Sequence, residues 1–279
     1  MVTPPSQLPP GRSRLRRRLR SVVRVAQIGL LTALLGLPAR LSVHLPPPTA
    51  HLGRGYRRWA FRAWCRACLR VADVRLTRIG RPPEPPFFLV ANHLSYLDIF
   101  VLGAELEDAV FVAQHGIAGW PMIGMLARSV DTIFVNRADH QDLLRVNQAV
   151  AAALDAGRSV VMFPEGTSTP GIRVEPFMSP VLDPPVRRRM AVHAAGLTYR
   201  TPLGEPPAAW SVCWWGDMAF VPHVLKLLEL REVAASVTFA GAPVLDDDRK
   251  RLARRLHAAI DAVFTPVVTG EDACRIPWP

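Results

Sequence analysis

The chain has 279 residues, of which 49% are hydrophobic and 20% are charged. This composition excludes a wholly disordered chain, and the length allows one large domain with a buried core. Four cysteines in such a length exclude a disulfide scaffold. The net charge of +11 is typical of a nucleic-acid binder, but it is unevenly distributed. Residues 1–81 carry +16 and residues 82–279 carry −5, so we expect no nucleic-acid partner for the body of the protein.

The N-terminal segment combines a basic stretch with an apolar one. Residues 1–11 are rich in Pro and Ser and are expected to form a disordered tail. Seven arginines between Arg12 and Arg24 then precede a charge-free run from Val25 to Ala39. As a helix this run would be about 22 Å long, less than the roughly 30 Å of a hydrocarbon core. We therefore expect a helix that lies in the membrane interface or dips partway into it, with arginines meeting anionic head groups.

Three other interpretations of this segment stay open. A secretory signal peptide has a similar basic start and apolar centre, but no convincing small-residue cleavage site follows Ala39. An arginine-rich arm for RNA would leave the apolar run without a use in solution. The helix could also simply pack on the body of the protein.

A second helical stretch is predicted from Gly55 to Val71, after a Pro-rich break at residues 46–48. Its tryptophans alternate with arginines, which suits a boundary between water and lipid. Residues 12–72 are thus predicted to be a basic amphipathic helical hairpin for membrane attachment. Cys65 and Cys68 form a C-x-x-C within this helix, without a second cysteine pair, so we expect neither a metal site nor a redox centre there.

From residue 73 to residue 265, predicted strands and helices alternate, which indicates an α/β domain: a central mixed sheet flanked by helices. The clearest helices are Gln141–Ala156 and Asp247–Val263, and residues 266–279 are expected to be a C-terminal tail. A Gly-rich phosphate loop and a G-x-S-x-G nucleophile elbow are both absent from the sequence, which argues against nucleotide-binding and serine-hydrolase functions. The predicted strands are Val74–Ile79, Pro86–Val90, Ala109–Ala113, Thr132–Val135, Ser159–Phe163, Ala191–Tyr199 and Ala234–Phe239.

The first candidate motif, Asn92–Asp98, directly follows an apolar strand. Ser95 and Asp98 have capping-box spacing, so a helix is predicted to begin at Ser95. The turn before it could let the Asp98 carboxylate reach back to one imidazole nitrogen of His93. That contact would fix the tautomer and leave the other nitrogen as a general base. Spacing alone leaves open that Asp98 is a cap and His93 a turn residue.

The second motif, Phe163-Pro164-Glu165-Gly166-Thr167, lies at the end of another apolar strand. Pro-Glu-Gly is ordinary turn chemistry. A carboxylate at the carboxyl end of a sheet strand is also where α/β proteins place ligand contacts. By itself this motif favours neither interpretation.

Together, His-x₄-Asp and Phe-Pro-Glu-Gly-Thr in this order resemble the glycerolipid (lysophospholipid) acyltransferase family. The resemblance covers about residues 60–265. Three further blocks carry it: Thr132–Arg137, Val174–Phe177 and Val221-Pro222.

The resemblance implies transfer of an acyl chain from a thioester, on coenzyme A or acyl carrier protein, to a lysolipid hydroxyl. His93 would deprotonate the hydroxyl and Asp98 would orient the imidazole. No covalent acyl-enzyme, metal or redox cofactor is implied. The protein would act at the cell membrane, on its cytoplasmic face. The residues expected to contact the substrate are Asn92, Ser95, Arg137, Glu165, Gly166, Thr167 and Arg173.

One departure from the family pattern bears on the acceptor. Many members carry an arginine directly after Phe-Pro-Glu-Gly-Thr, where this chain has Ser168 and Thr169. Arg173 could replace that arginine if the loop folds back. We expect 1-acylglycerol 3-phosphate as the acceptor, with a lyso-ornithine lipid as the alternative because the loop also resembles that branch. A catalytically inactive lipid-binding protein of the same fold is the alternative from another class.

Two further groups of residues are expected to be structural. The stretch Trp214–Met218 is interpreted as packing, with an acyl-chain tunnel as the functional alternative. The histidines at 115, 193 and 223 are interpreted as structural or surface residues.

Overall fold

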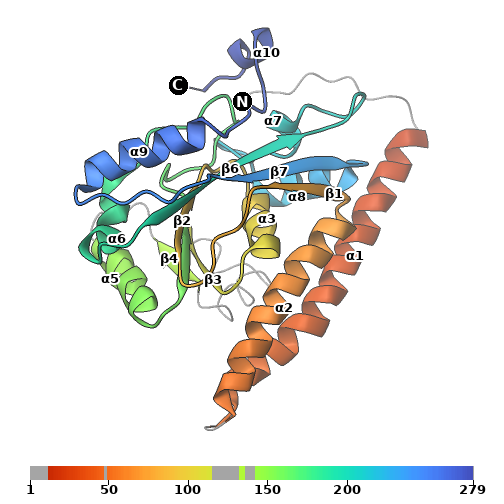
Figure 1. Cartoon of the computed structure of the whole chain (residues 1–279). Helices are drawn as coiled ribbons and strands as arrows, with labels where there is room; N and C mark the ends of the chain where they lie inside the picture. Colours follow the sequence, from red (N-terminus) through yellow and green to blue (C-terminus); the bar gives the residue numbers. More distant parts are fainter. Residues whose placement is uncertain (1–11, 47–48, 115–131, 136–141, 279) are drawn as a thin grey trace.

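The computed structural model describes residues 12–46, 49–114, 132–135 and 142–278. Within these residues a mixed sheet of seven strands carries helices on both faces, and a long helical hairpin runs along one side (Figure 1). The strand order is β1-β7-β6-β2-β5-β3-β4. The strands are β1 (Val74–Ile79), β2 (Phe88–Ala91), β3 (Ala109–Gln114), β4 (Ile133–Val135), β5 (Ser159–Met162), β6 (Val192–Arg200) and β7 (Val233–Phe239).

The direction of the strands places β2 at the centre of a parallel block. β2 pairs in parallel with both β5 and β6, and β5 continues the parallel order through β3 to β4. β7 runs antiparallel to β6 and parallel to β1, which makes the sheet mixed. Each predicted strand is confirmed, with its ends shifted by at most two residues.

Two hydrophobic cores lie on the two faces of the sheet. Along β2, Leu89 and Ala91 join the core beneath α2 (Ala50–Val71) and α3 (Leu97–Glu105), whereas Phe88 and Val90 join the core beneath α5 (Asp142–Asp155) and α9 (Arg249–Asp261). This alternation follows from the two-residue period of a strand. All four β2 residues are buried, as expected of a central parallel strand. Short elements complete the faces: η3 (Ser179–Leu182), α6 (Asp183–Arg187), α7 (Ala208–Ser211), α8 (Phe220–Glu229) and α10 (Glu271–Cys274).

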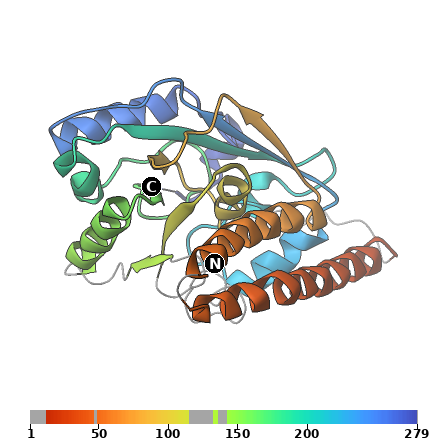
Figure 2. The same ribbon diagram turned by 60° about the horizontal axis from the view of Figure 1, so that its bottom comes forward.

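The hairpin consists of α1 (Arg12–Leu41), the 3-10 turn η1 (Ser42–His44) and α2. The two helices lie side by side along the body, and their connected end projects beyond the sheet (Figures 1 and 2). α2 begins five residues before the predicted Gly55. Of the described helices, α1 is the one long and apolar enough to cross a membrane by length and composition.

The face of α1 that meets the body is partly basic. Arg24 donates to the carbonyls of Leu228 and Leu230 (3.2 and 2.6 Å), and Arg20 donates to the carbonyl of Glu229 (2.9 Å). These carbonyls lie at the C-terminus of α8, where no intrahelical donor is left for them. Arg20 and Arg24 therefore cap α8, a role that the basic run in the sequence did not indicate.

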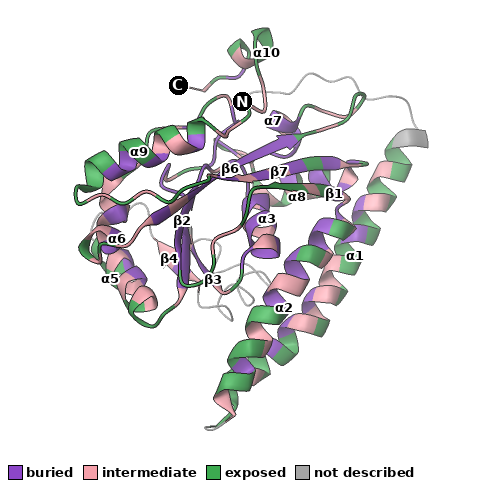
Figure 3. Ribbon diagram, viewed as in Figure 1, coloured by how far each residue is buried: buried purple, intermediate pink, exposed green. Residues whose placement is uncertain are grey.

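The outer side of α1 exposes many apolar side chains, which a helix of a soluble protein would mostly bury. In Figure 3 green, exposed segments run along the outer side of the hairpin. A leucine and valine stripe recurs every three or four residues over much of α1. Its members include Leu15, Leu19, Val22, Leu30, Leu34, Leu37 and Leu41.

The C-terminal segment packs on the loop that follows β5. Val267 N–H donates to the Gly171 carbonyl (2.8 Å), and the Trp278 indole donates to Glu175 Oε1 (2.8 Å). The Trp278 ring also lies edge-on against Trp215. Residues 266–278 thus cover part of the same loop that carries Glu165.

Candidate active site

His93 and Glu165 come together because their strands are neighbours. β2 and β5 run parallel, and each is followed directly by one of the two motifs. The carboxyl ends of parallel strands meet at one edge of a sheet, where α/β proteins form ligand sites. The Glu165 carboxylate accepts the His93 backbone N–H at 2.9 Å, which joins the two loops directly.

The imidazole of His93 is held by a carboxylate and an aromatic ring. Its Nδ1 lies 2.7 Å from Asp98 Oδ2, and its ring stacks on Phe163 with centroids 4.2 Å apart. Because the carboxylate accepts, Nδ1 carries the proton and Nε2 has a free lone pair. Among the described residues no protein group hydrogen-bonds to Nε2. The His93 side chain is 13% exposed, so it is partly accessible from outside the protein.

Asp98 is fully buried and accepts hydrogen bonds on both carboxylate oxygens. Besides His93, Oδ2 accepts the backbone N–H groups of Leu94 (2.7 Å) and Ser95 (3.0 Å). The predicted contact of the Asp98 carboxylate with the His93 imidazole is therefore present. The same carboxylate also makes the predicted capping contact to Ser95. The helix α3 itself begins at Leu97, two residues later than predicted.

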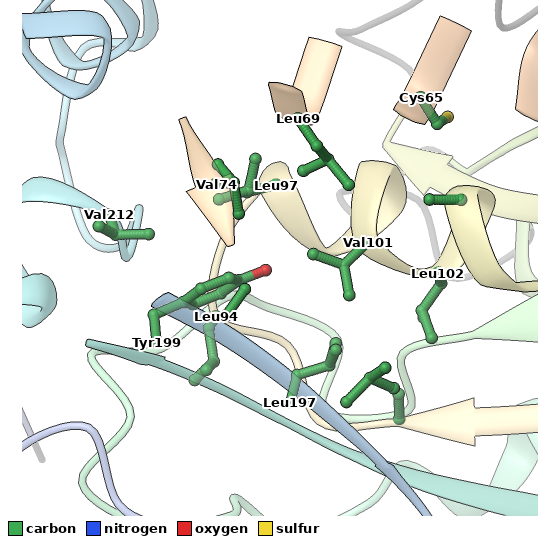
Figure 4. Close-up of a cluster of buried hydrophobic side chains, with 14 of the residues drawn as sticks. Cys65, Leu69, Val74, Leu94, Leu97, Val101, Leu102, Leu197, Tyr199 and Val212 are labelled. Carbon is green, nitrogen blue, oxygen red and sulfur yellow. The ribbon is translucent and has the colours of Figure 1, made fainter. Parts of the chain in front are cut away.

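The second oxygen of Asp98 accepts the Tyr199 hydroxyl at 2.6 Å. Tyr199 lies on β6, fully buried among residues such as Leu94 and Val101 (Figure 4). Burial, together with the negative charge of Asp98, raises the pKa of the Tyr199 phenol well above its usual value, so the hydroxyl stays a donor. Sequence reasoning missed this residue. Its one signal was a tyrosine inside a buried strand, where the hydroxyl needs a partner.

The side chains of Asn92 and Ser95 are buried and hold the loop around His93 in place. The Asn92 amide accepts from Leu197 N–H (2.7 Å) and donates to the Leu197 carbonyl (3.1 Å), with 1% of the residue exposed. Ser95 is fully buried, and its hydroxyl accepts from Leu97 N–H at 3.3 Å. Both of these predicted substrate-contact residues have their polar side-chain atoms engaged by the protein.

Glu165 is a buried carboxyl with one unpaired oxygen. Burial raises its pKa to about 8, although the N–H groups of His93 and Glu175 act in the opposite direction. Negative charge on Asp98 and Glu175 contributes further to the rise. Among the described residues, Oε2 has no hydrogen-bond partner. At neutral pH the carboxyl is therefore mostly protonated and has a donor to offer.

The next two residues of the motif have different surroundings. Gly166 has a φ of +74°, and a Cβ there would come within 2.7 Å of Met178 Sδ, so the turn requires glycine. Thr167 is exposed, which leaves its side chain open to a ligand.

The loops around the site are connected by hydrogen bonds that the sequence did not suggest. Thr169 N–H donates to the His93 carbonyl (3.0 Å), and Trp214 N–H donates to the Leu94 carbonyl (2.8 Å). The Ser168 hydroxyl donates to the Trp214 carbonyl. The residue in place of the family's arginine thus links the loop after β5 to the loop before α8.

The two arginines predicted for anionic contacts are placed differently. Arg173 pairs with Glu175 Oε1 at 3.1 Å, and its side chain is 56% exposed. Arg137 lies outside the described residues, as does the histidine at position 115.

Tyr96 and His223 form a buried pair beside the site. His223 Nε2 donates to the Cys213 carbonyl (2.9 Å), so its Nδ1 accepts the Tyr96 hydroxyl (3.1 Å). Burial lowers the pKa of His223 to about 4, which keeps the ring neutral. Cys65 and Cys68 are buried in α2, and the described residues include no group of three side chains that could hold a metal ion.

Comparison with known proteins places this site in a family. A sequence model of the family described as Acyltransferase matches residues 74–183, which include both motifs. The lyso-ornithine lipid O-acyltransferase of Rhodobacter capsulatus is 33% identical, over 92% of this chain and 93% of that protein. The 1-acyl-sn-glycerol-3-phosphate acyltransferase of Neisseria meningitidis serogroup B is 29% identical, over 71% of this chain and 78% of that protein.

A solved structure has the same fold. The crystal structure of the 1-acyl-sn-glycerophosphate (LPA) acyltransferase PlsC from Thermotoga maritima superposes with a TM-score of 0.67 at 16% identity, covering 94% of this chain and 99% of that one. The identity to the Rhodobacter protein over nearly the whole length of both chains establishes the relationship. The chain belongs to the acyltransferase family whose members include acyltransferases of lysolipids.

Proposed function

We propose that this protein transfers an acyl chain from a thioester to the free hydroxyl of a lysolipid, with His93 as the general base. The observation that carries the proposal is the His93–Asp98 pair, in which Asp98 engages Nδ1 at 2.7 Å and leaves Nε2 without a hydrogen-bond partner among the described residues. Residues 73–265 would form the catalytic domain. A catalytically inactive lipid-binding protein would have no need of this pair.

The reaction requires one proton to move and one bond to exchange. Nε2 of His93 takes the hydroxyl proton while the acceptor oxygen attacks the thioester carbon. The C–S bond then breaks, and the imidazolium returns the proton to the leaving thiolate. Asp98 stabilises the imidazolium, and a base so placed contributes about 10²–10⁴-fold to the rate. The thioester of coenzyme A or of acyl carrier protein would be the co-substrate.

The residues around the base divide into two roles under this proposal. Glu165 and Thr167 would contact the acceptor, because one has an unpaired buried oxygen and the other is exposed. Asn92 and Ser95 would act as positioning residues. A contact of Arg137 or Arg173 with an anionic group of the acceptor stays a prediction.

Among acceptors, a lyso-ornithine lipid is the one to test first. The position after Thr167 holds Ser168, which is buried and bonded to the Trp214 carbonyl, so no arginine is available there to clamp a phosphate. The 33% identity to the Rhodobacter lyso-ornithine lipid O-acyltransferase supports the same choice. The alternative acceptor, 1-acylglycerol 3-phosphate, is supported by the Neisseria relative.

The base assignment is tested by His93→Ala in the full chain, with His44→Ala as a control histidine on the exposed hairpin turn. We expect His93→Ala to lose acyl transfer while its circular dichroism is unchanged, and His44→Ala to keep full activity. Turnover by His93→Ala equal to that of the wild type would refute the role of the base. Lyso-ornithine lipid and lysophosphatidic acid, offered side by side with one thioester, identify the acceptor.

The exposed apolar face of α1 supports attachment to a membrane, and a cytoplasmic thioester implies the cytoplasmic face. Leu30→Gln/Leu34→Gln changes this face without touching the arginine contacts to α8. Leu144→Gln/Leu203→Gln removes two exposed leucines from the body and is the control. We expect the α1 double variant alone to float less with vesicles. A wild-type protein that stays at the bottom of the gradient would refute attachment.

A further inference from the structure

A cavity of about 470 Å³ lies at the end of the sheet opposite His93. Its lining includes residues that precede the strands β2, β3 and β5, among them Pro86, Asp108 and Arg158. His93 and Glu165 follow β2 and β5 at the other end. The separation is roughly 20 Å by strand rise, so the cavity is distinct from the candidate active site.

The cavity is basic. Its described lining residues include five arginines and two carboxylates, a surplus of three positive charges. The arginines are Arg54, Arg57, Arg58, Arg62 and Arg158.

The two carboxylates are already paired. Arg58 and Arg158 share Asp108 Oδ1 at 2.7 and 2.8 Å, and Arg62 pairs with Glu107 at 2.6 Å. Arg57 donates weakly to the Ser42 carbonyl at 3.4 Å. In the described part of the chain neither Arg54 nor Arg57 has a carboxylate partner. These two guanidinium groups therefore carry two of the three surplus charges, and the third comes from Arg58 and Arg158, which share the single carboxylate of Asp108.

The location of the cavity points to the source of an anion that could neutralise this surplus charge. The connected end of the hairpin exposes Leu41, Val43 and Leu52. Arg57 lies five residues beyond Leu52, a helical rise of about 8 Å, so the cavity opens close to exposed leucines that can contact lipid. Trp59 also lines the cavity and is 60% exposed, and tryptophan favours the boundary between water and lipid.

We propose that this cavity binds a phosphate group, supplied by the head group of an anionic membrane phospholipid. The volume lies within the range of small-molecule sites, and guanidinium groups bind phosphate oxygens in pairs. The lipid is a structural ligand here and is not consumed. The proposal rests on the membrane attachment proposed above, because the connected end of the hairpin must reach the bilayer.

The test compares Arg54→Gln/Arg57→Gln with Arg70→Gln/Arg81→Gln in the full chain. Arg70 and Arg81 are exposed and lie outside the cavity lining, so both double variants lose the same total charge. Binding is measured to vesicles of phosphatidylcholine alone and of phosphatidylcholine mixed with phosphatidylglycerol. We expect the cavity variant to bind the mixed vesicles about thirty-fold more weakly than the wild type, and the control less than about three-fold more weakly. Acyl transfer to micellar lysolipid is expected to be unchanged in both.

The outcomes separate the two proposals. A wild-type protein that binds neither vesicle contradicts the membrane attachment. If both double variants weaken vesicle binding equally, the cavity site is refuted, because the loss of two positive charges anywhere on the surface then explains the weaker binding. Glycerol 3-phosphate is added as a soluble competitor, with sodium chloride of equal ionic strength as its control. Absence of competition supports the lipid source, whereas competition that needs Arg54 and Arg57 supports the phosphate site but assigns it a soluble ligand.

Discussion

The buried carboxyl of Glu165 makes a contribution to the stability of the protein that should be lost as the pH rises. Its pKa is about 8 in the folded protein and 4.5 at its ordinary value. Between these values the folded state binds more protons than the unfolded chain, so this contribution to the free energy of unfolding falls with rising pH. Each pH unit changes the contribution of this carboxyl by about 1.36 kcal/mol, so the contribution of Glu165 to the free energy of unfolding should fall by roughly 3 kcal/mol between pH 5 and pH 7. Below pH 4.5 the full contribution of the protonated Glu165 carboxyl is present, and above pH 8 it is completely lost.

Glu165→Gln removes this dependence because the amide stays neutral at every pH. Urea unfolding of both proteins at pH 5, 6 and 7 should show a stability difference that moves steadily in favour of the variant. In thermal unfolding this corresponds to a relative shift of roughly 5–10 °C for a domain of this size. Glu271→Gln, at an exposed carboxylate, is the control and should follow the wild type. A difference between wild type and Glu165→Gln that is constant with pH would refute the reasoning.

Three further predictions concern the groups around His93. Asp98→Asn should lower kcat by about 10³–10⁴-fold, because the amide can no longer stabilise the imidazolium; steady-state rates near those of the wild type would contradict this. Tyr199→Phe removes a donor to a buried charge and should cost about 1.5–3 kcal/mol in urea unfolding, and a loss under half a kcal/mol would contradict the contact. His223 has a pKa of about 4, below its ordinary 6.5, so the folded state binds fewer protons and stability falls as the pH drops from 6.5 to 4. The free energy of unfolding should fall by about 3 kcal/mol over this pH range because of His223, and the fall should be absent in His223→Gln. The same pH dependence in the wild type and the variant would contradict this prediction.

The strands and the contact between His93 and Asp98 could be predicted from the sequence because their signals are local. Short apolar runs ending in turn residues marked each strand. The pairing of β2 with β5, which brings His93 to Glu165 across 72 positions, has no local signal, and before the structure only the family resemblance joined the two motifs. The contact between His93 and Asp98 needed one turn of chain, so capping-box spacing was enough to suggest it.

The remaining contacts depend on residues far apart in the chain. Tyr199 reaches Asp98 across 101 positions, and Ser168 reaches Trp214 across 46, with no pattern that pairs them. Two arginines of α1 have a role that the sequence does not indicate for a similar reason. A basic run beside an apolar one predicts contact with lipid head groups, but Arg20 and Arg24 donate to carbonyls of α8 that the sequence does not show to be unpaired.

Because α1 caps α8, the hairpin is part of the folded body and cannot be removed without affecting it. The last turn of α8 depends on Arg20 and Arg24 for its donors. Its first turns carry His223, which accepts a hydrogen bond from Tyr96, a residue of the same motif as His93. A shortened chain without α1, made to obtain a water-soluble enzyme, would leave α8 uncapped and loosen the loop that carries His93. Polar substitution of the outer leucines, with the arginines retained, is the route to solubility that keeps the site intact.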